Sequence, residues 1–90
     1  MKTAMHVKKV NMKPTARQNL YQLSEPLEGH DFVIISYNSD MWSNETYVFG
    51  ADSFGNVEDW GELSASKGGE YSDVEILEEA GYRILTEVKQ

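Results

Sequence analysis

The stretch that decides the fold is Phe32-Val33-Ile34-Ile35-Ser36-Tyr37. Successive side chains of a β-strand point to opposite faces, so Phe32 and Ile34 share one face while Val33 and Ile35 share the other. Both faces of this strand are therefore apolar. We expect it to lie in the middle of a sheet that is covered on each side.

Two further strands are predicted downstream, near residues 45–51 and 56–60. The first contains Thr46-Tyr47-Val48-Phe49, which is rich in β-branched and aromatic residues. Between them, Asp52 opens a polar segment and Gly55 accepts a positive φ, which suits a hairpin turn. Together with residues 31–38, these strands predict an antiparallel meander over residues 31–60.

A capping box predicts one helix at about residues 72–80. The Ser72 hydroxyl can accept a hydrogen bond from the Glu75 amide, while the Glu75 carboxylate reaches back to the Ser72 amide. Gly81 then supplies the left-handed residue that ends a helix. Shorter strands are expected at residues 19–23, closed by Ser24-Glu25-Pro26, and at residues 83–88. We predict an α+β fold, with a three- to five-stranded, mainly antiparallel sheet and this helix packed on one face.

The chain has 90 residues, which is enough for one small domain. We assign residues 18–90 to this domain and residues 1–17 to a basic N-terminal arm. The arm contains few large apolar side chains, so it is either disordered or an edge strand that Pro14 ends. The longest apolar run, residues 32–35, is too short to span a bilayer, and a cytoplasmic protein is expected.

Charge is unevenly distributed along the sequence. The net charge is −7, yet residues 1–17 carry five cations and no acid, and residues 25–66 carry nine acids and no Lys or Arg. One interpretation is that the basic arm lies against the acidic segment and neutralises it. The other is that an acidic face stays uncovered, repels nucleic acids and membranes, and attracts a basic protein surface. Direct binding of nucleic acid by the domain body is disfavoured by the sign of its charge.

No pattern typical of a catalytic or metal site is present. Cys is absent, and neither His6 nor His30 belongs to a recognisable ligand or catalytic spacing. Glu58 and Asp59 are adjacent, so in a regular strand they face opposite sides and cannot share one site. We expect no enzyme activity, no metal and no cofactor.

Exposed aromatic residues beside acids are instead typical of a protein-binding surface. Trp42, with Met41 before it, lies on a polar connection, where it either folds back as a lid or projects as an interface anchor. Phe54 at the hairpin tip is a second candidate anchor. The predicted partner-binding residues are Asp40, Met41, Trp42, Glu45, Asp52, Phe54, Glu58, Asp59 and Glu62.

The segment Glu45-Thr46-Tyr47-Val48-Phe49-Gly50-Ala51-Asp52, continuing through Gly55-Asn56-Val57-Glu58-Asp59-Trp60-Gly61-Glu62-Leu63, resembles small acidic proteins of bacteriophage and prophage genomes. The later Glu79-Ala80-Gly81-Tyr82 is similar in the same way. The resemblance implies an inhibitor of host defence, of the anti-CRISPR or anti-restriction kind, which occupies a basic nucleic-acid-binding site on a bacterial host protein.

Two hypotheses of different classes follow. The first is a non-enzymatic binding or inhibitor module whose acidic surface docks on a basic partner. The second is a structural or assembly protein of phage or prophage origin, or a small homo-oligomer, because one helix cannot cover a strand that is apolar on both faces. A homodimer is therefore the alternative to a host partner.

Overall fold

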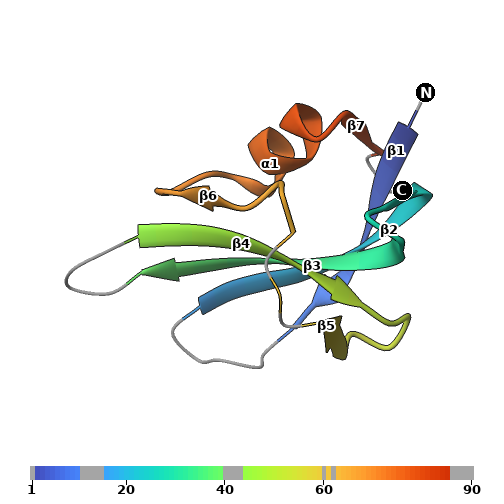
Figure 1. The fold of residues 1–90 in the computed structure, drawn as a ribbon, viewed down its shortest axis with the longest axis horizontal. Helices are drawn as coiled ribbons and strands as arrows, with labels where there is room; N and C mark the ends of the chain where they lie inside the picture. The colour runs from blue at the N-terminus through green and yellow to red at the C-terminus, as the bar shows by residue number, and fades with distance from the viewer. Residues whose placement is uncertain (1, 11–15, 40–43, 60, 62, 86–90) are drawn as a thin grey trace, which may run out of the picture.

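The computed structural model describes residues 2–10, 16–39, 44–59, 61 and 63–85 (Figure 1). These residues form a seven-stranded mixed sheet and one short helix, α1. The elements are β1 (Lys2–Lys9), β2 (Ala16–Leu27), β3 (His30–Ser39), β4 (Asn44–Ala51), β5 (Val57–Asp59), β6 (Lys67–Gly68), α1 (Asp73–Glu79) and β7 (Tyr82–Leu85). The order across the sheet is β5-β4-β3-β2-β1-β7, and β6 also pairs with β4.

The predicted fold class, a three- to five-stranded, mainly antiparallel sheet with a packed helix, is therefore wrong. Strand dominates the described residues, and the sheet combines antiparallel pairs with a parallel pair of β1 and β7. The strands expected within residues 31–60 are present as β3, β4 and β5, but they make up less than half of the sheet. The strands formed near the two ends of the chain account for the difference.

β3 is the central strand of the sheet, as its apolar pattern requires. It pairs antiparallel with β2 on one side and with β4 on the other. Val33, Ile34 and Ile35 have no exposed surface. Burying each of these side chains contributes about 1.5–3 kcal/mol relative to exposure, so β3 needs cover on both faces.

The first face of β3, here called the helix face, carries Val33 and Ile35 and is covered by α1. Ile76 and Leu77 are the buried residues of α1. They pack in one cluster with side chains from five strands and the connecting segment: Ala4, Tyr21, Leu23, Val33, Ile35, Val48, Leu63 and Tyr82. None of the described helical residues forms a segment long and apolar enough to cross a membrane.

The second face, here called the turn face, carries Ile34 and is covered by much less chain. Its cluster consists of Val10, Leu20, Ile34 and Ala51, with Phe32 and Val57 packed against it. The turn between β4 and β5 folds over this cluster, because Leu20 lies 3.6 Å from the position that a Cβ on Gly55 would take. In Figure 1, α1 and β5 accordingly lie on opposite sides of the central strands.

β1 does not lie at the edge of the sheet over its first half. It pairs with β2 on one side, and its residues 2–5 pair in parallel with residues 82–85 on the other. Two contacts hold β7 there: the Tyr82 hydroxyl donates to the Glu25 carbonyl at 2.7 Å, and the Lys2 ammonium lies 4.6 Å from the centre of the Tyr82 ring. Lys2 also donates to the Ala80 carbonyl at 3.4 Å, where a cation favours the helix C-terminus.

β2 is also longer than predicted, because Ser24-Glu25-Pro26 does not close it. The register of β2 against β3 is irregular between Gln22 and Leu27, and Pro26 lies in that irregularity. A proline without an amide hydrogen is tolerated in a strand at such a bulge.

The outer edge of β4 is covered along its length by the segment from β5 to Gly69. Gly50 and Ala51 pair with β5, the Val48 carbonyl accepts from the Leu63 amide at 2.9 Å, and Thr46 pairs with β6. This edge is therefore not open to strand pairing. Among the described residues, no strand pairs with the outer edge of β7.

The capping box predicted from the spacing of Ser72 and Glu75 is present. The Ser72 hydroxyl accepts from the Glu75 amide at 3.1 Å, and the Glu75 carboxylate accepts from the Ser72 amide at 3.0 Å. The helix has only seven residues, too few to be stable alone, so its cap and its two buried side chains hold it.

Replacing Ser72 with Ala should lower the free energy of unfolding by about 1 kcal/mol, because the Glu75 amide at the start of α1 loses its hydrogen-bond acceptor. Urea unfolding followed by circular dichroism measures the change. Ser53→Ala, at an exposed turn position, is the matched control and should leave the midpoint unchanged. Equal midpoints for the two variants would contradict this account of the helix.

Candidate protein-binding surface

The turn between β4 and β5 is organised by the carboxylate of Asp52. Its Oδ1 atom accepts from the backbone amides of Phe54 and Asn56, both at 2.9 Å, and its Oδ2 atom accepts from the Asn56 side chain at 3.2 Å. The Asp52 amide donates to the Asn56 carbonyl at 2.9 Å, and Gly55 takes the positive φ of 93° that closes the turn. The result is a rigid turn that presents Phe54 with 75 % of its surface exposed.

The same hydrogen bonds make the Asp52 carboxylate more acidic. Donation from the Asn56 backbone amide is the largest cause of its lowered pKa. Because the folded pKa lies below the unfolded value of 3.8, the charged form stabilises the fold above that value. This contribution is lost as the pH falls through the folded pKa.

Asp52→Asn should therefore destabilise the protein at neutral pH, and the difference from wild type should shrink as the pH falls below about 4. Urea midpoints measured from pH 7 to pH 3 test this dependence. Asp31→Asn, at an exposed position, serves as the charge control. A wild-type advantage over Asp52→Asn that grows towards low pH would contradict the sign of the pKa change.

A bulge in β5 directs Glu58 and Asp59 to the same imidazole. Gly50 pairs with Asp59 but Ala51 pairs with Val57, so Glu58 is the extra residue. The Glu58 carboxylate lies 3.8 Å from His30 Nδ1, and the Asp59 carboxylate lies 4.0 Å from His30 Nε2. In a regular strand Glu58 and Asp59 would face opposite sides of the sheet. The bulge makes β5 irregular here, and bulges commonly redirect side chains.

The His30 ring occupies the space above Gly50. A Cβ on Gly50 would collide with three atoms of the ring, so only glycine leaves room for it. The side chain of His30 is accordingly only 18 % exposed, although sequence analysis gave it no role. His30 ties the β2–β3 turn to β5 across the end of β4.

Gly50→Ala should displace the His30 ring and lower the free energy of unfolding by about 1–3 kcal/mol, a typical effect of overpacking. In a His30→Ala background the collision disappears, and the same substitution should cost much less. Urea unfolding of the four proteins in this double-mutant cycle measures the coupling. Gly68→Ala is the matched control, because nothing lies within 4 Å of its added Cβ. An equal cost of Gly50→Ala in both backgrounds would contradict the contact.

Glu28, in the β2–β3 turn, holds the connecting segment after Leu63. Its carboxylate accepts from the hydroxyl and from the amide of Ser64, the latter at 2.8 Å. The hydrogen bond from the Ser64 hydroxyl is the largest cause of the lowered pKa of Glu28. The φ of 50° at Glu28 belongs to the same tight turn.

The structure brings together four of the predicted site residues. Asp52, Phe54, Glu58 and Asp59 lie on the β4–β5 hairpin, here called the acidic hairpin. Glu45 lies at the opposite end of β4, half-buried and paired with β6, so it does not belong to this surface. The remaining predictions, Asp40, Met41, Trp42 and Glu62, fall outside the described residues.

No described cation of residues 1–17 forms an ion pair with the acidic hairpin. Among the described residues, the ion pair of Arg17 is with Asp73 at 3.9 Å, and Lys2 is engaged at the end of α1. Lys8 approaches most closely, since its Nζ lies 3.6 Å from the Cβ position of Gly55, but no ion pair joins it to Asp52 within the described part of the chain. The carboxylates of Glu58 and Asp59 remain more than half exposed.

A separate polar cluster on the helix face was not predicted. The Asp73 carboxylate accepts from the Tyr21 hydroxyl at 2.9 Å and from the Asn19 side chain at 3.0 Å, and His6 in turn contacts Asn19 at 3.0 Å. Burial, reinforced by Asp73, raises the pKa of Tyr21 above its usual value. The cluster joins the start of α1 to β2, and nothing local in the sequence indicates this long-range contact.

The acidic hairpin offers charge and apolar contact rather than catalytic groups. Across the described residues, no three His, Cys, Asp or Glu side chains are grouped closely enough to hold a metal ion. Comparisons with protein-family models, with curated proteins and with solved structures found no match.

Proposed function

We propose that the chain is a non-enzymatic protein-binding module, an inhibitor of phage type. In this proposal the acidic hairpin occupies a basic, nucleic-acid-binding site on a protein of a bacterial host. Its carboxylates take the place of phosphates, and Phe54 supplies the apolar anchor. The mechanism is competition with nucleic acid for one cationic surface.

The observation that supports this proposal most is an exposed aromatic side chain on a rigid, negatively charged turn. Phe54 is 75 % exposed, and the Asp52 hydrogen bonds fix the backbone on both sides of it. A backbone segment that is fixed before binding loses little conformational entropy when it docks. Aromatic anchors are also enriched among the residues that contribute most to binding.

The negative charge of the acidic hairpin supports a partner that has a positively charged surface. Asp52, Glu58 and Asp59 face no described Lys or Arg within ion-pair distance, and His30 is the one described basic group beside Glu58 and Asp59. Exposed charges of one sign accelerate association with an oppositely charged surface, and salt screens this attraction. Binding should therefore be fast and sensitive to salt.

The variants Phe54→Ala and Asp52→Asn/Glu58→Gln/Asp59→Asn should each weaken binding to such a partner by about tenfold or more, which corresponds to about 1.4 kcal/mol. The partner is captured from bacterial lysate at low salt and identified by mass spectrometry. Displacement of nucleic acid from the purified partner is then titrated with each variant.

The matched control is Glu25→Gln/Glu70→Gln/Glu78→Gln, which removes the same charge at exposed positions elsewhere. It should displace nucleic acid nearly as well as wild type. The proposal fails if the captured partner keeps its nucleic acid, or if the hairpin variants and the control act alike.

A further inference from the structure

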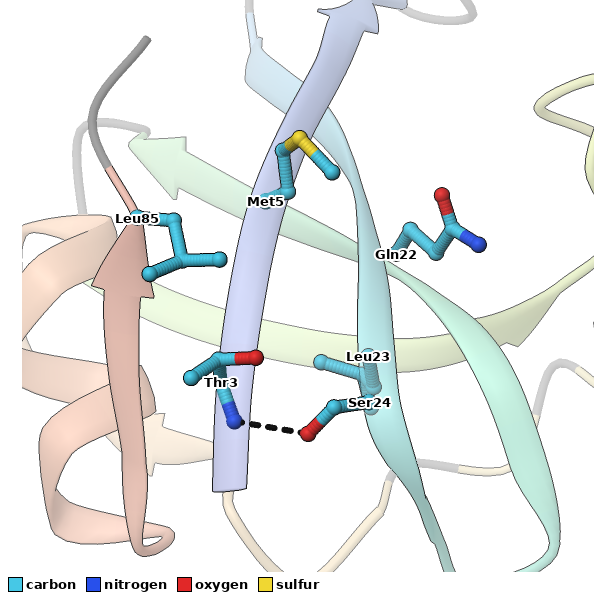
Figure 2. Close-up of a pocket in the computed structure, with 6 residues that line it drawn as sticks. All are labelled: Thr3, Met5, Gln22, Leu23, Ser24 and Leu85. Carbon is cyan, nitrogen blue, oxygen red and sulfur yellow. Dashed lines mark hydrogen bonds between the residues drawn. The ribbon is translucent and has the colours of Figure 1, made fainter. Parts of the chain in front are cut away.

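The turn face contains an apolar hollow at the end of the sheet away from the acidic hairpin. It has a volume of about 150 Å³ and is lined by Thr3, Met5, Gln22, Leu23, Ser24 and Leu85. These residues come from β7, β1 and β2, which are neighbours in the sheet (Figure 2). A cavity of about this volume holds a benzene-sized group, so one aromatic side chain fits.

One cation, Arg83, lies beside this hollow on the same face. It pairs in register with Thr3, which lines the hollow. Within the described residues, Arg83 takes part in no ion pair. β1 and β7 together carry Lys2, Lys8, Lys9 and Arg83 and no carboxylate. The hollow therefore favours an apolar group that is accompanied by negative charge.

The chain itself carries such a group on the same face. Phe54 lies two residues after Asp52 in the β4–β5 turn. Gly55 of the same turn packs against Leu20. Gln22, two residues along β2 from Leu20, lines the hollow, so turn and hollow face the same way. Of the five large apolar side chains that the described residues expose, three belong to this turn and this hollow: Met5 at 43 %, Phe54 at 75 % and Leu85 at 45 %.

We propose that the turn face is the interface of a homodimer with two-fold symmetry, in which Phe54 of each copy enters the hollow of the other. Because the projecting side chain and its hollow share one face, a two-fold axis makes two equal contacts and closes the assembly. Asp52 then approaches the side of the partner copy that carries Arg83. This dimer forms without a host protein. A host protein that binds Phe54 would compete with dimerisation, because both use the same side chain.

The first test is sedimentation of the full chain from micromolar to millimolar concentration, at low and at high salt. We expect a monomer–dimer equilibrium that weakens as salt is raised, because opposite charges meet across the interface. Phe54→Ala, Leu85→Glu and Met5→Gln should each weaken dimerisation by about tenfold or more. Val74→Ala is the matched control, since Val74 is 45 % exposed on α1 and should dimerise as wild type does.

The second test uses mixtures of two variants that are each defective on a different side of the contact. Labelled Phe54→Ala protein keeps an intact hollow, and unlabelled Leu85→Glu protein keeps an intact Phe54. Adding the second to the first should shift the amide NMR signals of Thr3 and Met5. Adding unlabelled Phe54→Ala protein to the same labelled sample should leave them unchanged.

A monomer at every concentration would overturn the homodimer, as would dimerisation of Phe54→Ala equal to that of wild type. Absence of the NMR shifts in the mixed sample would overturn the insertion of Phe54 into the hollow. Met5→Gln provides a second hollow variant whose near-native volume preserves the fold. These results are independent of lysate capture, so the homodimer and the host-partner proposal can fail separately.

Discussion

The structure depends on one constraint, which is that β3 is apolar on both faces and must be covered twice by a short chain. On the helix face, two buried residues of α1 and the side chain of Tyr82 meet this need. On the turn face the described part of the chain places no helix, and the β4–β5 turn folds back over the cluster of Leu20 and Ile34 instead. Burial of one such side chain contributes about 1.5–3 kcal/mol, whereas an exposed ion pair contributes about 0–1 kcal/mol. Packing therefore determines where the charged side chains lie. The acidic hairpin is positioned by its contact with the apolar cluster of the turn face.

The parts of the fold that could be predicted are those set by neighbouring residues. The apolar alternation of β3, the turn chemistry of Asp52 and Gly55, and the pairing of Ser72 with Glu75 all act within a few positions of the chain. The parallel pairing of β1 with β7 joins residues about eighty positions apart and involves a strand of four residues, so no local pattern indicates it. The fold class was wrong because this pairing, and the extension of β2 through Pro26, depend on tertiary context.

The same division applies to the candidate site. The placement of Asp52 and Phe54 in an outward turn could be predicted because a turn at the tip of a hairpin exposes its residues whatever the rest of the fold does. His30 was missed because its place depends on the missing Cβ of Gly50, twenty positions away. Glu45 was grouped with the hairpin by sequence proximity, yet β4 separates them by most of its eight residues, about 20 Å of extended chain. The bulge that turns Glu58 and Asp59 to one imidazole is likewise a property of the pairing with β4.

The segregation of charge in the sequence persists in the fold because the cations have other contacts. Lys2 lies at the end of α1, and Arg17 contacts Asp73 and donates to the Tyr71 carbonyl at 2.9 Å. Among the described residues, His30 is the basic side chain that lies near Glu58 and Asp59, while Arg83 lies beside an apolar hollow. Met5, Phe54 and Leu85 expose large apolar side chains to water, which is unfavourable and marks surface that a partner can cover. Whatever covers Phe54 must bring positive charge and an apolar surface together, and both a basic host site and a second copy of this chain satisfy that requirement.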